Sequence, residues 1–143
     1  RSGKNWRTCV MLSDGELDEG SNWEAILFAP QHKLDNLVAI VDYNKIQSLG
    51  SVADVMELDP LADKFRAFRW GVKEIDGHDH DAIHEALSTL PFEVGKPSCL
   101  IAHTIKGKGV DFMENDHGWH GIAPNDDQLA KALAQLQETI GDY

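Results

Sequence analysis

The sequence has few of the features that would tie it to an oxidising compartment, a membrane or a nucleic acid. Its only two cysteines, Cys9 and Cys99, lie in apolar runs, which predicts reduced core thiols in a cytoplasmic protein. No hydrophobic run is long enough to cross a membrane, and no secretory leader is recognisable, so we expect no membrane partner. Lysine and arginine number 13 against 24 aspartates and glutamates, and the net charge of −11 argues against general nucleic-acid binding.

The chain does contain enough apolar material for one domain of ordinary size. Its 143 residues are 42% hydrophobic, and no internal repeat or low-complexity tract interrupts them. Short apolar runs that resemble strands alternate with segments of helical period. This alternation predicts an α/β fold in layers, with a mainly parallel sheet and helices on both of its faces.

Two expected helices carry specific signals. The first has Ser21 as a plausible N-cap with Glu24 three positions later, a capping-box pattern, and Pro30 should end or kink it near residues 28–29. The last should begin after a cap at residues 125–127. Its apolar residues recur at helical spacing and predict a stripe that faces the core: Leu129, Leu133, Leu136 and Ile140.

Polar residues follow the first two predicted strands, at residues 8–12 and 36–41. Asp14 follows the first strand and Asn44 the second, and a strand-helix-strand crossover brings both carboxyl ends to one edge of the sheet. A carboxylate, an amide oxygen and a nearby backbone carbonyl suit Mg²⁺ or Ca²⁺, and Gly15 would allow a phosphate to approach. These residues predict a diphosphate-bearing cofactor bridged by a divalent cation. The alternative is a solvated acidic turn.

A further strand, expected at residues 98–105, leads to Lys106 at the same edge. A lysine there can meet phosphate as a point charge, although a surface lysine beside a glycine-rich turn is the alternative. The loop that follows contains His117, Trp119 and His120 without an apolar period, and histidine can shuttle protons near neutral pH.

Three more histidines, at positions 78, 80 and 84, could suggest a metal site. No carboxylate or cysteine completes a zinc set at a typical spacing, so we interpret them as polar residues of a turn and a helix start.

Several stretches in sequence order resemble one family. Asp14-Gly15-Glu16, with Asn44 thirty positions after Asp14, resembles the thiamine diphosphate signature. The wider sequence from Asp14 to Ala25 resembles transketolases in particular. Residues 33–37, 76–79, 101–109 and 119–124 fit the same family, so the resemblance covers nearly the whole chain.

The resemblance implies the N-terminal section or subunit of a transketolase. It implies one diphosphate-binding domain over residues 1–143, incomplete at its N-terminus, that binds thiamine diphosphate with Mg²⁺, for which Ca²⁺ could substitute. The implied reaction transfers a two-carbon ketol unit between ketose and aldose phosphates. The implied partner is a transketolase C-terminal subunit carrying the pyrimidine-binding domain, within a homo- or hetero-oligomer, and the chain is expected to be inactive alone.

The resemblance also implies roles for individual residues. The metal ligands would be Asp14, Asn44 and the carbonyl of Ile46, whereas Gly15 and Lys106 would contact the diphosphate. His120 matches a histidine that lies over the thiazolium and contacts diphosphate and substrate.

Two acidic residues match glutamates that link the two active sites across the transketolase dimer interface. These are Glu19 and Glu24, and the alternative for Glu24 is that it only caps its helix.

Two other functions compete with this one. The chain could belong to another thiamine diphosphate enzyme, such as a deoxyxylulose phosphate synthase or a 2-oxoacid dehydrogenase, but the Glu19/Glu24 pair and the loop at residues 119–121 weigh against it. It could instead be a non-catalytic assembly module, and the intact Asp14, Asn44 and His120 weigh against that.

Overall fold

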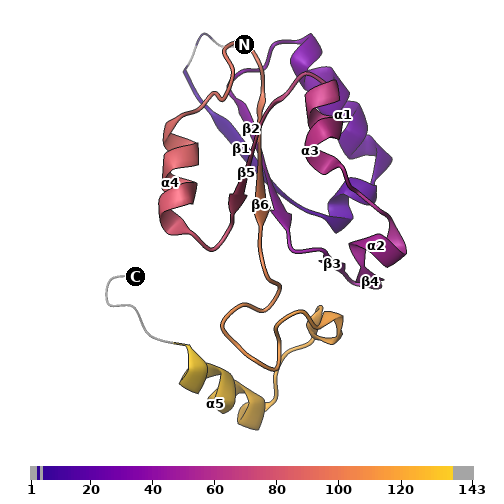
Figure 1. Cartoon of the computed structure of the whole chain (residues 1–143), viewed down its shortest axis with the longest axis vertical. Helices are drawn as coiled ribbons and strands as arrows, with labels where there is room; N and C mark the ends of the chain where they lie inside the picture. Colours follow the sequence, from indigo (N-terminus) through magenta and orange to yellow (C-terminus); the bar gives the residue numbers. More distant parts are fainter. Residues whose placement is uncertain (1–2, 4, 137–143) are drawn as a thin grey trace.

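The computed structural model describes residue 3 and residues 5–136, and these form a parallel sheet covered by helices on both faces (Figure 1). The predicted α/β fold is therefore confirmed. The four strands lie in the order β1-β2-β6-β5 and every neighbouring pair is parallel. Their bounds are Thr8–Ser13 for β1, Leu37–Tyr43 for β2, Gly71–Asp76 for β5 and Ser98–His103 for β6.

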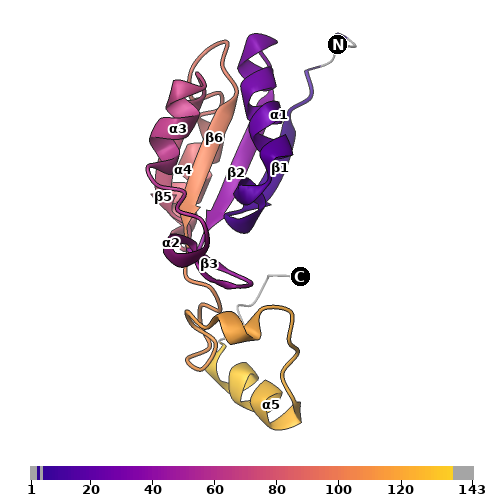
Figure 2. The ribbon, with the colours of Figure 1, turned by 90° about the vertical axis from the view of Figure 1, so that its right-hand side faces the viewer.

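The helices divide unequally between the two faces. Helices α1 (Gly20–Gln31) and α3 (Leu61–Ala67) cover one face, and α4 (His80–Ser88) covers the other (Figures 1 and 2). A two-residue hairpin, β3 (Ile46–Gln47) with β4 (Gly50–Ser51), leads into α2 (Val52–Val55). One 3-10 turn, η1 (Gly15–Asp18), follows β1, and a second, η2 (His117–Trp119), precedes α5 (Asp126–Gln135).

The main core lies between the sheet and helices α1 and α3. Phe65 of α3 is fully buried and meets Trp70 edge-on, with ring centroids 5.5 Å apart, and Trp23 of α1 lies 5.9 Å from Phe65. Val41 of β2 and Ile101 of β6, the two central strands, belong to the same buried cluster. Such aromatic burial fixes the two helices against the strands whose ends carry the polar residues.

Helix α1 differs from its prediction at both ends. Its N-cap is Glu19 with no side-chain cap bond, so the predicted capping box of Ser21 and Glu24 is wrong. The helix also continues through Pro30 to Gln31. Proline cannot donate to the carbonyl four residues earlier, that of Ile26, but the indole Nε1 of Trp70 donates to this oxygen at 2.8 Å. The core therefore supplies the hydrogen bond that proline removes.

The α4 face of the sheet is only partly covered, and this corrects the prediction for Cys9. Residues Cys9 and Met11 of edge strand β1 align with Val38 and Ile40, and helix α4 lies over β5 instead. Cys9 is exposed and Met11 is 68% exposed, whereas Cys99 is buried as predicted.

The last helix, α5, carries an exposed apolar face. Asn125 caps it in a capping box with Gln128, within the cap range that we predicted. The predicted core-facing stripe is wrong, because α5 lies beyond the carboxyl edge of the sheet (Figure 1) and Leu129, Leu133 and Leu136 are exposed. Ile140 lies outside the described residues.

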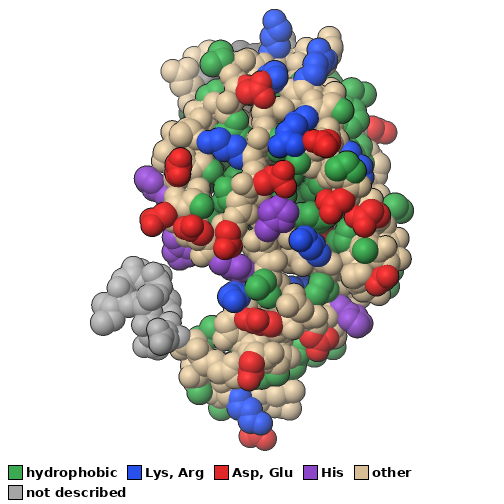
Figure 3. Space-filling model, viewed as in Figure 1, with side chains coloured by type: hydrophobic (Ala, Val, Ile, Leu, Met, Phe, Trp, Pro, Cys, Tyr) green, Lys and Arg blue, Asp and Glu red, His purple; other side chains and the backbone are tan. Residues whose placement is uncertain are grey.

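On the face shown in Figure 3, acidic and basic side chains are mixed, and no large patch of one charge stands out. In the part of the chain that the structure describes, no helix combines the length and apolarity that crossing a bilayer requires.

We expect a thiol reagent to modify one cysteine in the native chain and both after unfolding. Cys9 is exposed, whereas burial, with a smaller contribution from Glu74, raises the pKa of the Cys99 thiol far above its usual range and disfavours its reactive thiolate. Mass spectrometry after timed alkylation measures this, and Cys9→Ser should abolish native labelling. Equal labelling of both thiols in the native chain would contradict the fold.

Candidate active site

A pocket of about 410 Å³ lies where β1, β2 and the segment after β6 reach the carboxyl edge of the sheet. Ser13 aligns with Asp42 across the parallel pair, so Asp14 and Asn44 leave adjacent strands at the same level. Seven of the eight predicted site residues line this pocket: Asp14, Gly15, Glu19, Asn44, Ile46, Lys106 and His120.

Asp14 holds the two loops of the pocket together. Its side chain is 2% exposed, Oδ1 accepts from the N–H of Gly15 at 2.8 Å, and Oδ2 accepts from the N–H of Lys45 at 2.6 Å. Burial raises the pKa of Asp14 above its ordinary value; these two hydrogen bonds oppose the shift, Asp42 adds to it and Lys106 opposes it. A nearby cation would favour the ionised form of this buried carboxylate.

Asn44 is oriented by its neighbours in the chain. Its Oδ1 accepts from the N–H of Ile46 at 3.0 Å, and its Nδ2 donates to Oδ1 of Asp42 at 3.4 Å. The hydroxyl of Thr104, from the segment after β6, donates to the same Asp42 oxygen. Asp42 therefore ties Asn44 to the segment that carries Lys106, a role that sequence reasoning missed.

Lys106 and His120 reach the pocket from a loop that folds back on itself. Lys106 Nζ lies 3.4 Å from Nδ1 of His120. Gly107 has φ +75°, and a Cβ there would lie 2.4 Å from the carbonyl oxygen of Met113, so the returning chain requires glycine. The N–H of His120 donates to the carbonyl of His117 at 2.9 Å, and His117 itself does not line the pocket.

The indole of Trp119 also supports this loop. Its Nε1 donates to the carbonyl of Phe112 at 2.8 Å and the two rings lie 5.5 Å apart, so the tryptophan fixes the turn that presents His120.

Gln47 is a pocket residue that sequence reasoning did not select. It lies in β3 and is 7% exposed, and within the described residues its Nε2 is the one buried side-chain nitrogen or oxygen without a hydrogen-bond partner. The β3–β4 hairpin carries Gln47, and its side chain is buried where it lines the pocket. Its position three residues after Asn44 is the sequence feature that could have placed Gln47 in the pocket.

The two predicted interface glutamates lie in different surroundings. Glu19 lines the pocket at the start of α1, whereas Glu24 is exposed on α1 and does not line it. The interface roles of both residues stay predictions.

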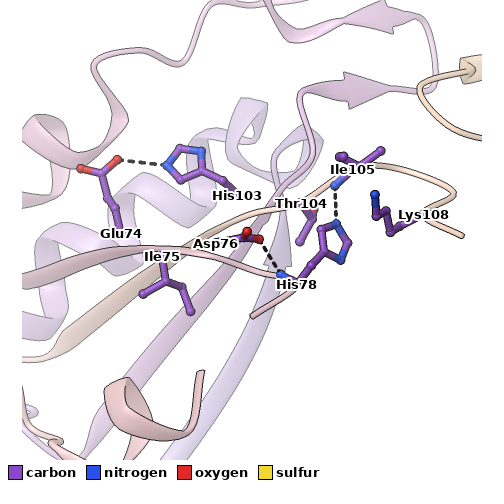
Figure 4. Close-up of a pocket in the computed structure, with 8 residues that line it drawn as sticks. All are labelled: Glu74, Ile75, Asp76, His78, His103, Thr104, Ile105 and Lys108. Carbon is purple, nitrogen blue, oxygen red and sulfur yellow. Dashed lines mark hydrogen bonds and ion pairs between the residues drawn. The ribbon is translucent and has the colours of Figure 1, made fainter. Parts of the chain in front are cut away.

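A second pocket, of about 550 Å³, lies beside the ends of β5 and β6 (Figure 4). His103 Nε2 pairs with Oε2 of Glu74 at 3.2 Å, and His78 points toward Ile105, whose N–H donates to its Nε2 at 2.8 Å (Figure 4). His78 thus holds the segment just before Lys106. The described residues contain no group of three histidine, cysteine, aspartate or glutamate side chains that could hold a metal ion.

The first pocket fits a diphosphate with a divalent cation better than the second. Its lining includes the buried Asp14, together with Asn44, Ile46, Lys106 and Gln47, whose amide nitrogen is unpaired among the described residues. Mg²⁺ bound by few protein oxygens completes its shell with water and phosphate oxygens, so a set with one carboxylate is sufficient. Lys106 would supply a charged donor to the anion.

The comparisons with known proteins identify the family. The chain matches the family described as transketolase, thiamine diphosphate binding domain, over residues 4–139. It therefore belongs to the transketolase family and corresponds to its N-terminal section.

Two curated relatives are named as transketolase subunits. The chain is 40% identical over 136 residues to an apulose-4-phosphate transketolase subunit of Phocaeicola vulgatus, covering 95% of this chain and 48% of the relative. It is 42% identical over 129 residues to a 6-deoxy-6-sulfo-D-fructose transketolase subunit of a Clostridium species, covering 90% and 47%. The chain thus spans about half the length of these relatives.

A solved structure confirms the fold. The transketolase of Campylobacter jejuni matches with a TM-score of 0.84 and 33% identity, covering 91% of this chain and 20% of that one.

We expect Asp14→Ala to lower the free energy of unfolding by about 2 kcal/mol, because it leaves two backbone N–H groups without their acceptor. Asp14→Asn keeps the shape and one acceptor oxygen and should cost less. Urea denaturation measures both, with the exposed Asp35→Ala as the control that changes little. An Asp14→Ala chain as stable as wild type would show that these hydrogen bonds do not hold the loops.

Proposed function

We propose that the chain binds thiamine diphosphate with Mg²⁺ and acts in ketol transfer as the N-terminal section of a transketolase. The observation that carries this proposal is the convergence of Asp14, Asn44, Lys106 and His120 in one pocket, from three separate segments of a family member. The family match and the relatives named as transketolase subunits favour this reaction over those of the other thiamine diphosphate enzymes.

Different residues of the pocket would bind different parts of the cofactor. Asp14, Asn44 and the Ile46 carbonyl would hold Mg²⁺, and Ca²⁺ has the same preference for oxygen ligands. Gly15 and Lys106 would contact the diphosphate, Lys106 through its charge. Thiamine diphosphate, when bound, supplies the carbon that carries the two-carbon unit, and the protein orients it and excludes competing reactions.

His120 is the proposed proton carrier. It is exposed at the pocket rim and its Nδ1 lies 3.4 Å from Lys106 Nζ. The imidazole in its neutral form can accept a proton from a substrate hydroxyl and return it. Glu19 and Glu24 would act across the interface with a second copy.

The proposed substrates are sugar phosphates. Two relatives are named for different sugars: apulose 4-phosphate is a phosphate, whereas 6-deoxy-6-sulfo-D-fructose carries a sulfonate. Both names support the ketol reaction, and the first supports the phosphate class.

The proposed partner is a C-terminal transketolase subunit carrying the pyrimidine-binding domain, in a cytoplasmic homo- or hetero-oligomer. Three relatives named as subunits support it, as does the apolar surface of α5, where Leu133 is 62% exposed. The chain would be inactive without that partner.

We expect calorimetric titration of thiamine diphosphate into the chain to show saturable binding that requires Mg²⁺. Asp14→Asn should weaken it at least tenfold, because the variant keeps the side-chain shape but loses the charge that attracts the cation. Asp35→Asn, an exposed change outside the pocket, should bind like wild type. Binding that is unaffected by chelation or by Asp14→Asn would contradict the proposed metal site.

We expect ketol transfer only when the chain is mixed with a transketolase C-terminal subunit. Turnover of a ketose phosphate and an aldose phosphate should appear on mixing and fall strongly in His120→Ala, because the substrate proton would lose its acceptor. A coupled assay measures this, with His117→Ala, a change in the same loop outside the pocket, as the control. Steady turnover by the pure chain would refute the partner requirement.

A further inference from the structure

Gln47 is a buried polar side chain with an incomplete set of hydrogen bonds. It is more than nine-tenths buried, and its Nε2 is without a partner among the residues that the structure places. A buried N–H without an acceptor costs free energy, and folded proteins pair most such groups. An unpaired donor that lines a ligand pocket therefore indicates an acceptor that the ligand brings.

The position of Gln47 identifies the part of the pocket that this acceptor would occupy. A Cβ built on Gly15 would lie 3.6 Å from Cγ and 3.7 Å from Cδ of Gln47, so the carboxamide lies along the Gly15 backbone. Asn44 and Ile46 precede it in the same segment, and Lys106 lines the same pocket. These are the residues to which the proposed function assigns the cation and the diphosphate.

The hairpin limits how far this side chain can move away. Gln47 pairs with Gly50 across β3 and β4, and the N–H of Val52 donates to the Lys45 carbonyl at 2.9 Å. The backbone on both sides of Gln47 is thus tied down. The amide is also neutral, whereas a second lysine or a carboxylate at this position would add a charge beside Asp14.

We propose that the side-chain amide of Gln47 donates a hydrogen bond to a phosphoryl oxygen of the bound diphosphate. This inference rests on the proposed function and adds to it a binding residue from the β3–β4 hairpin. Gln47 would be a neutral donor that orients the diphosphate beside Gly15, complementing the charge of Lys106.

Two substitutions at this position separate binding from folding. Gln47→Met keeps the length of the side chain and removes the donor, and Gln47→Glu keeps the shape but replaces the donor with a negative charge. We expect affinity for thiamine diphosphate with Mg²⁺ to fall about tenfold or more in Gln47→Met, and further in Gln47→Glu. Gln31→Met, an exposed change at the end of α1, is the matched control and should bind like wild type.

Two further readouts exclude a merely structural role. Gln47→Met removes an unpaired buried donor, so the ligand-free variant should melt at the same temperature as wild type or higher. Its loss of affinity should appear equally for inorganic pyrophosphate with Mg²⁺, which lacks the thiamine ring. Lower melting temperature with unchanged affinity would show that the amide serves the fold, and a loss seen with thiamine diphosphate alone would place the contact on the ring; either result overturns the proposal.

The failure of this inference can be told apart from failure of the proposed function. If wild type binds in an Asp14-dependent manner and Gln47→Met binds equally well, only the role of Gln47 is refuted. If wild type shows no Mg²⁺-dependent binding, alone or with a C-terminal transketolase subunit, the proposed function fails and this inference fails with it.

Discussion

The site depends on one buried carboxylate that accepts hydrogen bonds from two loops. Asp14 follows the edge strand β1, and its two oxygens accept from the N–H groups of Gly15 and Lys45. The second of these bonds joins the end of β1 to the end of β2 directly below the pocket. Because the carboxylate is buried, each bond is stronger than in water and its loss would be costly. The same residue thus sets the shape of the pocket and would supply the ionic ligand for a cation.

The arrangement of the site could be predicted from sequence because it follows from the parallel sheet. Adjacent parallel strands place the residues after them at one edge, so the positions of Asp14, Asn44 and Lys106 followed from strands whose apolar runs were plain. His120 lies 17 residues beyond the end of β6, and only the family resemblance assigned it. The loop that brings it back depends on Gly107 and Trp119, contacts that periodicity does not reveal.

Several of the errors concern which surface a side chain meets. Cys9, Leu129 and Leu133 lie in apolar patterns that normally face a core, yet their side chains are exposed. Apolar spacing shows that a face needs a partner, not where the partner lies. The continuation of α1 through Pro30 had a similar cause, since the carbonyl of Ile26 is satisfied by Trp70, 44 residues away in the chain. The misplaced cap at Ser21 shows that a local motif can yield to the geometry of the preceding turn.

Two features of the pocket are unfavourable for the ligand-free chain, and both point in the same direction. The pKa of Asp14 is higher in the folded chain than in the unfolded chain, so Asp14 stays protonated to a higher pH when the chain is folded. Ionisation of Asp14 therefore lowers the stability of the folded chain as the pH rises from the unfolded to the folded pKa. Gln47 adds a buried donor without an acceptor. A divalent cation would stabilise the ionised carboxylate, and an anionic oxygen would accept from the amide. Both costs would therefore fall if a cation and an anion bound together at this edge of the sheet, which is what the proposed function requires of the pocket.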